Sequence, residues 1–314
     1  MPELPEVQTV VNGIKSKIKN HKILRFEKYI SKLRYPIQRN LSLKIEGYKV
    51  TAVFRRGKYI IINLSNNRSL IIHLGMSGRI IIAKNNKKYF KHTHFCILFN
   101  KNLVLQFIDP RRFGYLLVTK TALLEKHKFF ENLGVEPLSK KFNFKYLMNL
   151  LQNKKSPIKN IIMNQKYIVG VGNIYAAEAL FMSGIDPIKL GKDLSKKNCI
   201  DLVLSIKDVL KKSIKLGGSS INDHTMISGK IGYFQNKLKV YGREGLKCRK
   251  RSCQSSILRI VIAQRSTFYC AQCQKWKLDK NMANTKSAKG KIREITKKTD
   301  INKSVRNRYR TYIK

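Results

Sequence analysis

The spacing of apolar residues changes along the chain and predicts different kinds of structure in succession. Val7, Val10, Val11, Ile14 and Ile18 recur every three or four residues, as on the buried face of one helix. From about residue 22 to residue 119, short runs of β-branched and aromatic residues alternate with Asn- or Gly-containing breaks. These runs predict about eight strands, at residues 23–30, 45–54, 59–64, 69–74, 80–83, 95–99, 103–107 and 115–118. We therefore expect an N-terminal β-sandwich or flattened barrel with one leading helix.

From about residue 121 the apolar spacing becomes helical. It predicts helices at residues 122–130, 144–151, 157–163 and 174–181, and a long helix at 195–216 that ends at Gly217-Gly218. Before the fourth helix, Gly170 and Gly172 permit a tight double turn, and Asn173 is placed to cap that helix. Exposed amides at such a helix start suit a DNA phosphate, although an ordinary helix hairpin explains the same residues. Residues 219–242 follow as a Gly- and Ser-containing loop.

Four cysteines in the last part of the chain have a specific spacing. Cys248 and Cys253 are separated by four residues, Cys270 and Cys273 by two, and sixteen residues lie between the pairs. Two close thiol pairs across a hairpin predict a tetrahedral structural zinc site, with disulfides as the alternative. Residues 258–262 and 267–269 are the predicted strands of that hairpin, which places Arg265 near its tip. The other two cysteines lie in apolar runs and are assigned to the core.

Composition narrows the class of partner. The 314 residues include 65 Lys and Arg against 18 Asp and Glu, a net charge of +47, and 43% are hydrophobic. So large an excess of positive charge favours a polyanion, with nucleic acid ahead of a membrane surface, although a compositional bias toward Lys, Asn and Ile would scatter charge without a partner. No stretch predicts a membrane span or a signal peptide, so we expect a cytoplasmic protein. Residues 276–314 are basic, lack apolar periodicity and predict a disordered tail.

The first residues of the chain combine an amine with a carboxylate. If Met1 is removed, Pro2 presents a secondary amine next to the acid Glu3. An α-amino group is less basic than a lysine, and amines attack carbonyl-like carbons to give Schiff bases. A frayed terminus with Pro5 in the first helical turn explains the same residues without chemistry.

Three loops between predicted strands also carry unusual residues. Arg55-Arg56-Gly57-Lys58 suits either a phosphate contact or a solvated turn. In Gly75-Met76-Ser77-Gly78, a flexible apolar side chain on a glycine turn is a candidate wedge between bases, or else a core methionine. The segment 109–114 contains Arg111, Arg112 and Phe113, side-chain types that read base edges and stack on bases.

Taken together, these motifs closely resemble those of the bacterial formamidopyrimidine-DNA glycosylase family. The resemblance covers residues 2 to about 273 and rests on residues 2–6, 57–58, 75–78, 109–114 and 171–176 and on the four cysteines. It implies an α+β multidomain fold: a catalytic N-terminal β-sandwich domain (1–120), a helix-two-turn-helix DNA-binding domain (121–240), a zinc finger (241–275) and the basic tail (276–314). It also implies a bifunctional DNA glycosylase and AP lyase of base excision repair, a monomer in the bacterial cytoplasm and nucleoid. The expected partner is double-stranded DNA that contains oxidised bases, chiefly 8-oxoguanine and formamidopyrimidines.

The resemblance also implies roles for individual residues. Pro2 is the nucleophile that forms a Schiff base, Glu3 is the general acid, and strand cleavage follows by β,δ-elimination. Lys58 and Arg265 complete the catalytic set, and Cys248, Cys253, Cys270 and Cys273 bind one structural Zn²⁺. Met76, Arg111 and Phe113 fill the gap that a flipped base leaves. The further expected DNA contacts are Arg112, Lys159, Asn173 and His92. Without the resemblance, the dispersed positions of the six histidines would assign all of them to structural roles.

Two other interpretations stay open at this stage. A zinc-stabilised DNA-binding protein without catalysis is expected if Met1 is retained. The second alternative is an enzyme that prefers oxidised pyrimidines, as endonuclease VIII does. Leu4, Met76 and the 111–113 pattern favour the enzyme that acts on purines. The sequence departs from the family pattern where Asn164 replaces an acidic residue, and the tail extends beyond the usual end of the family.

Overall fold

The structure is a computed structural model that describes residues 2–84, 89–219 and 234–274. The expected tail at 276–314 and most of the loop at 219–242 lie outside these residues. Within the described ranges, no helix combines the length and the apolar character that crossing a bilayer requires.

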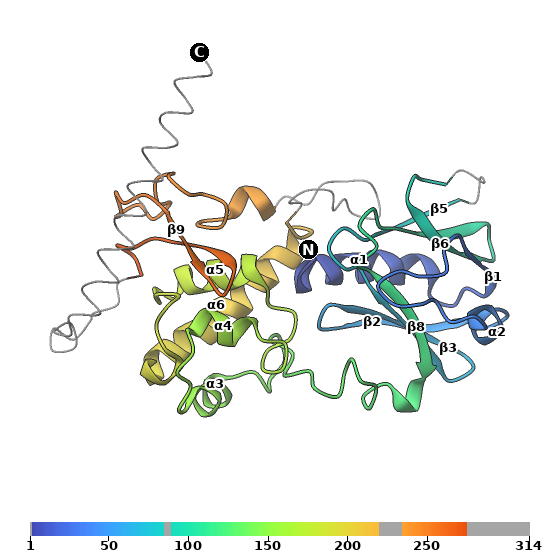
Figure 1. The fold of residues 1–314 in the computed structure, drawn as a ribbon, viewed down its shortest axis with the longest axis horizontal. Helices are drawn as coiled ribbons and strands as arrows, with labels where there is room; N and C mark the ends of the chain where they lie inside the picture. Colours follow the sequence, from blue (N-terminus) through green and yellow to red (C-terminus); the bar gives the residue numbers. More distant parts are fainter. Residues whose placement is uncertain (1, 85–88, 220–233, 275–314) are drawn as a thin grey trace, which may run out of the picture. The chain divides into compact units, whose positions relative to one another are not determined.

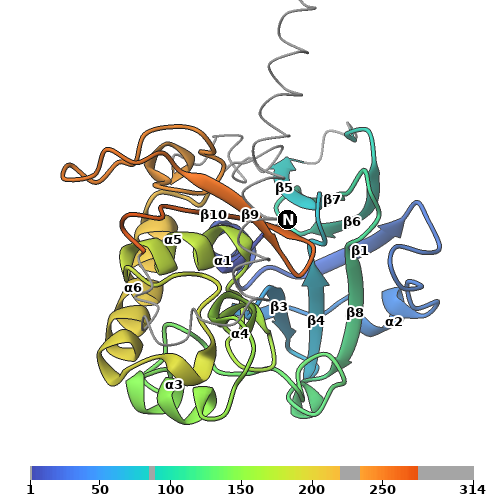
Figure 2. The same cartoon turned by 60° about the vertical axis from the view of Figure 1, so that its left-hand side comes forward.

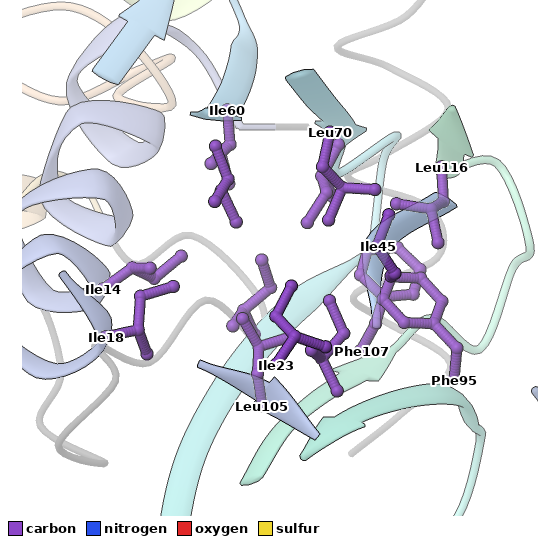
Figure 3. Close-up of a cluster of buried hydrophobic side chains, with 14 of the residues drawn as sticks. Ile14, Ile18, Ile23, Ile45, Ile60, Leu70, Phe95, Leu105, Phe107 and Leu116 are labelled. Atoms are coloured by element: carbon purple, nitrogen blue, oxygen red, sulfur yellow. The ribbon is translucent and has the colours of Figure 1, made fainter. Parts of the chain in front are cut away.

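The predicted N-terminal sandwich is confirmed: eight antiparallel strands form two four-stranded sheets. One sheet has the order β1-β6-β7-β5 and the other β2-β3-β4-β8. The first comprises β1 (Ile23–Lys28), β5 (Arg79–Lys84), β6 (Thr93–Phe99) and β7 (Leu103–Ile108), and the second β2 (Val50–Arg56), β3 (Tyr59–Leu64), β4 (Arg68–His73) and β8 (Tyr115–Lys120). Figure 3 shows Ile60, Leu70 and Leu116 from the second sheet and Ile23, Phe95, Leu105 and Phe107 from the first in one buried cluster. The apolar runs of the strands therefore meet in a single core between the sheets.

The predicted strand at 45–54 begins later than expected. The short helix α2 (Leu41–Ile45) occupies its start, and β2 begins at Val50. Between them Gly47 adopts a left-handed φ of 84°, which turns the chain and separates the two elements.

Helix α1 (Leu4–Ile18) connects two hydrophobic cores. Its buried residues Val7, Val11, Ile14 and Ile18 belong to the core of the sandwich, whereas Leu4 belongs to the core of the later helices. The helix contacts both β2 and α6 (Lys196–Lys215), and Figure 1 shows it between the strands and the helical part of the chain. The first residues of the chain are thereby held at the junction of the two cores.

The later helices agree closely with the apolar spacing. They are α3 (Phe144–Leu151), α4 (Ile158–Met163), α5 (Asn173–Met182) and α6, with the short 3-10 helices η2 (Gly191–Asp193) and η3 (Phe234–Lys237). The hairpin of β9 (Leu258–Ile262) and β10 (Arg265–Tyr269) packs with β10 on α5, as Figure 2 shows. Its tip consists of Ala263 and Gln264, both with left-handed φ, so Arg265 follows directly after the tip.

The predicted helix at 122–130 is wrong. Only the 3-10 turn η1 (Thr121–Leu123) forms, and most of the backbone hydrogen bonds that follow join residues three apart, such as His127 to Leu124. The cause is packing: the neighbouring rings of Phe129 and Phe130 both lie against Tyr59 of the sandwich. Adjacent residues of an α-helix point about 100° apart, so an ordinary helix does not turn both rings toward the same side chain.

Candidate active site and zinc centre

The carboxylate of Glu3 lies at the amino end of helix α5. Its Oε2 accepts a hydrogen bond from the amide of Gly172 at 2.8 Å, and its Oε1 accepts one from the amide of Ile174 at 3.0 Å. A side chain at Gly172 would displace the carboxylate, because a Cβ there would lie 2.3 Å from Cδ of Glu3. The double turn predicted to hold a phosphate therefore holds the carboxylate of Glu3 next to Pro2, and both side chains are buried.

Burial and nearby charges change the protonation of this carboxylate. Burial is the largest influence and raises the pKa of Glu3, the neighbouring Glu6 raises it further, and the ammonium of Lys58 and the helix amides lower it. Burial likewise lowers the pKa of Lys58, while Glu3 and Glu6 raise it and Arg265 lowers it. A carboxyl group whose pKa is raised toward neutrality can hold a proton and donate it, as a general acid does.

Glu6 forms a second buried network behind Glu3. Its Oε2 accepts the amide of Glu3 at 2.8 Å, and its Oε1 accepts the hydroxyl of Tyr175 and, at 2.9 Å, the amide of Ser219. The Tyr175 hydroxyl also contacts Oγ of Ser213 at 2.6 Å. This network joins α1, α5 and the end of α6 around the start of the chain, so the position of Glu3 is fixed from several elements.

The turn between β2 and β3 presents Lys58 to the site. Gly57 in this turn has a left-handed φ of 57°, and its amide donates to Oε1 of Glu136 at 2.7 Å. Arg55 pairs with the same carboxylate at 2.8 Å, and Arg56 donates to the carbonyl of Gly134 at 2.9 Å. The two arginines thus fasten the turn to residues 134–136, and Lys58 is the cation of this turn that is coupled electrostatically to Glu3.

The tip of the β9–β10 hairpin meets α4 and α5 on the same side. Nδ2 of Asn173 donates to the carbonyl of Ser266 at 2.9 Å. Lys159 is 1% exposed, and its ammonium donates to Oγ1 of Thr267 at 2.6 Å. Burial, followed by the charge of Arg265, lowers the pKa of Lys159 to about 8. Arg265 itself is exposed beside the tip. Asn173 and Lys159, both expected as DNA contacts, are therefore engaged with the hairpin in this structure.

The expected gap-filling residues lie on two adjoining turns. Met76 and Phe113 are 40% and 42% exposed, and the guanidinium of Arg111 lies over the ring of Phe113 at 5.0 Å from its centre. Arg112 is exposed with a left-handed φ of 55°. His92 is exposed as well, and its carbonyl accepts the amide of Asp109 at 3.1 Å. An apolar chain, a cation and an aromatic ring are thus presented together at the surface.

Sequence reasoning missed several residues of the site. Glu136, Ser213 and Ser219 carry no local signal, because their partners are far away in the chain. The assignment of His73 to structure agrees with its surroundings, since its ring stacks on Tyr115 with centroids 5.0 Å apart, and burial, followed by the charge of Lys58, lowers its pKa to about 4.

The four cysteines form the predicted zinc centre. Their sulfur atoms all lie within 4.8 Å of one another, with 3.8 Å between Cys248 and Cys273 and 3.6 Å between Cys253 and Cys270. Four thiolates at the usual Zn–S length in a tetrahedron lie about 3.8 Å apart, so the set fits one Zn²⁺. The other two cysteines, Cys96 and Cys199, are buried in the cores as expected.

Comparison with known proteins gives consistent matches along the chain. Residues 1–116 match the formamidopyrimidine-DNA glycosylase N-terminal domain, residues 133–225 match the H2TH domain of the same enzyme, and residues 245–275 match the zinc finger found in FPG and IleRS. Formamidopyrimidine-DNA glycosylases of Rickettsia bellii and of a Wolbachia pipientis strain are 46% and 44% identical to the chain. They cover 88% and 87% of it, and the alignments span 100% of each relative.

Solved structures agree with these sequence matches. A Lactococcus lactis FPG bound to DNA that contains Fapy-dG superposes with a TM-score of 0.81 at 32% identity. A MutM structure in complex with DNA that contains carbocyclic 8-oxo-G superposes with a TM-score of 0.79 at 33% identity. Each match covers 88% of this chain and 100% of the other. The chain therefore belongs to the formamidopyrimidine-DNA glycosylase family, whose members are DNA repair enzymes with glycosylase and AP lyase activity.

Proposed function

We propose that this enzyme excises oxidised purines, 8-oxoguanine and formamidopyrimidines, from double-stranded DNA and then cleaves the strand through a Schiff base on Pro2. The related structures were solved with DNA containing Fapy-dG and carbocyclic 8-oxo-G, which supports this class of lesion. The arrangement of Pro2, Glu3 and Lys58 supports the chemistry. The observation that carries the proposal is the buried carboxyl of Glu3, held by the start of α5 beside the residue that becomes the terminal amine.

The reaction begins once Met1 has been removed. The nitrogen of Pro2 attacks C1′ of the damaged nucleotide, the bond from C1′ to the base breaks, and the base leaves with a proton. The bond from C1′ to the ring oxygen then opens, and the oxygen takes the proton of Glu3 while nitrogen and C1′ form an iminium. Because the charge of Lys58 lowers the pKa of Glu3, Lys58 stabilises the carboxylate that remains.

Strand cleavage follows from the electron demand of the iminium. Loss of a proton from C2′ allows electrons to move toward nitrogen and expels the 3′ phosphate in a β-elimination. A second elimination, with loss of a proton from C4′, expels the 5′ phosphate, and water then hydrolyses the iminium to free the sugar from Pro2, so a gap of one nucleoside remains. The cations Lys58 and Arg265 are the proposed phosphate contacts on either side of the sugar.

Borohydride trapping tests the proposal, because it reduces the iminium to a stable covalent link. We expect the wild type to be trapped on duplex DNA with 8-oxoguanine opposite cytosine. Glu3→Gln should lower the single-turnover rate of covalent trapping by about 100-fold or more, since a general acid contributes at least that factor. Glu27→Gln is the matched control: it removes a carboxylate that hydrogen-bonds Tyr29 at the surface of β1, and it should leave the rate unchanged.

Each alternative has its own outcome. DNA binding without trapping, in a zinc-loaded sample whose mass confirms a Pro2 terminus, would overturn the Schiff-base mechanism. DNA binding with Met1 still attached would favour a non-catalytic protein. Faster cleavage of thymine glycol than of 8-oxoguanine would overturn the preference for purines.

A further inference from the structure

The hydroxyl of Ser77 and the carboxylate of Asp109 link the two turns that carry the exposed wedge residues. Oγ of Ser77, next to Met76, donates to Oδ1 of Asp109 at 2.6 Å. The same hydroxyl oxygen accepts the amide of Arg111 at 3.2 Å. The second oxygen of Asp109 accepts the amide of Gly114 at 2.7 Å. One serine and one aspartate thus connect the Met76 turn to both ends of the 111–114 turn.

The backbones of the two turns are in direct contact. Gly75 has a left-handed φ of 65°, and a Cβ on it would lie 2.4 Å from the amide nitrogen of Gly114 and from the carbonyl carbon of Phe113. A Cβ on Gly114 would lie 2.5 Å from the ring of Phe107. Because no side chain fits between the turns, a shift of one turn is transmitted to the other.

The side chain of Asp109 is buried and fully hydrogen-bonded. Its residue is 0% exposed, and its oxygens accept from a hydroxyl and an amide, both neutral groups. Its main-chain carbonyl accepts Nε2 of the buried His94 at 2.7 Å, which anchors it to β6. Within the described ranges, no Lys or Arg forms a salt bridge with it. Both oxygens of the buried carboxyl group are therefore paired by hydrogen bonds within the two turns, which ties the turns together inside the fold.

We infer that Ser77 and Asp109 are positioning residues that hold Met76, Arg111 and Phe113 at a fixed spacing, so that the three side chains enter the base stack as one unit. The inference rests on the proposed function, because it takes these side chains to occupy the gap left by a flipped base. It assigns the hydrogen bond between Ser77 and Asp109 a role in opening the duplex and none in the chemistry at C1′. The link acts through the wedge residues and does not itself touch DNA.

Ser77→Ala tests this inference, with Ser69→Ala as a matched control. Ser69 is a buried serine of the sandwich, whereas Ser77 is half-buried, and the Ser69 hydroxyl contacts Asn63 and Thr121 at 2.8 and 2.9 Å. Both variants lose hydroxyl hydrogen bonds in the same domain, so a purely structural effect should be similar in the two. The readouts are single-turnover excision of 8-oxoguanine from duplex DNA and the fluorescence rise of a 2-aminopurine placed beside the lesion, which reports unstacking.

We expect Ser77→Ala to slow both readouts about tenfold, the factor expected for one hydrogen bond that fixes a geometry. Trapping on a preformed abasic site in single-stranded DNA should stay within about twofold of wild type, because no base stack has to be opened there. Ser77→Thr, which keeps the hydroxyl, should restore most of the rate. Ser69→Ala should behave as wild type in both readouts.

A double-mutant cycle with Met76→Ala decides whether Ser77 acts through the wedge. If it does, adding Ser77→Ala to Met76→Ala should lower the excision rate by clearly less than the tenfold expected in the wild type, because part of the wedge is already missing. Independent, multiplicative losses in the excision rate would overturn the inference. Equal excision rates for Ser77→Ala and Ser69→Ala, measured beside an active wild type, would also overturn it. Failure of the wild type itself to excise the base, with DNA binding intact, would overturn the proposed function together with the inference.

Discussion

Gly172 sets the position of the proposed general acid more directly than any neighbouring residue. Gly172→Ala should displace the carboxylate of Glu3, because the added Cβ would lie 2.3 Å from its Cδ. A displacement of about 1 Å in a catalytic group lowers rates by about 100-fold, so single-turnover trapping should fall by that factor. Gly47→Ala is the control: its φ of 84° makes alanine strained, yet nothing lies within 4 Å of the new Cβ. Equal activity of the two variants would contradict this account of the site.

The buried ammonium of Lys159 should make stability depend on pH. Its pKa is lowered from 10.5 to about 8 in the folded protein, so the unfolded chain binds the proton more tightly. The penalty for burying the charge is complete below about pH 8 and disappears as pH rises through 10.5, so stability should increase with pH over this window. Relative to Lys159→Met, wild type should gain about 2 kcal/mol between pH 7 and pH 9.5 in urea unfolding. A pH-independent difference would show that Lys159 keeps its ordinary pKa.

At the scale of elements, the zinc centre should govern the β9–β10 hairpin but not the sandwich. The hairpin contacts α4 through the hydrogen bond of Lys159 with Thr267, and α5 through that of Asn173 with Ser266. A hairpin this small depends on its metal. Removing zinc with a chelator should therefore raise amide hydrogen exchange across residues 258–269 and lower DNA affinity at least about tenfold, while β2 to β4 stay protected.

The control for zinc removal is Cys199→Ala, which changes a buried cysteine outside the cluster. This variant should keep one equivalent of zinc and wild-type affinity. Unchanged exchange in the hairpin after complete zinc release would contradict a structural role for the metal.

Elements could be predicted from the sequence where their signal is local. The three- and four-residue spacing from Val7 to Ile18 and the β-branched runs of the sandwich identified α1 and the eight strands. The prediction failed at 122–130, where the contacts of Phe129 and Phe130 with Tyr59 override helical spacing.

The sequence motifs predicted candidate residues for the site but not the partners that hold them in place. Motifs pointed to Pro2, Glu3, Lys58 and the cysteines. That Glu3 is held by an amide 169 residues away is a consequence of tertiary structure with no counterpart in local pattern. The burial of Lys159 and the link from Ser77 to Asp109 depend in the same way on long-range contacts.

At the scale of the whole molecule, Pro2 and Glu3 are held in place because α1 belongs to two cores. Leu4 packs with the helices and Val7 with the sandwich, so the two residues before Leu4 are held where both parts meet. A terminus is usually frayed, and a nucleophile on a frayed terminus would lose the orientation that catalysis requires. The amphipathic pattern of α1 therefore serves both the fold and the proposed chemistry.

The net charge of +47 predicts that DNA binding by the entire chain depends strongly on salt concentration. Each neutralised phosphate should contribute a slope of about −0.9 to a plot of log affinity against log salt. Residues 275–314 carry fourteen Lys or Arg and three acidic residues, so a chain ending at residue 274 should show a shallower slope on undamaged duplex. Its excision rate at saturating enzyme should match the full chain, because the proposed catalytic residues all precede the truncation. An equal slope for the two chains would mean that the charges of the tail do not meet DNA, and a lower saturated rate would give the tail a part in catalysis.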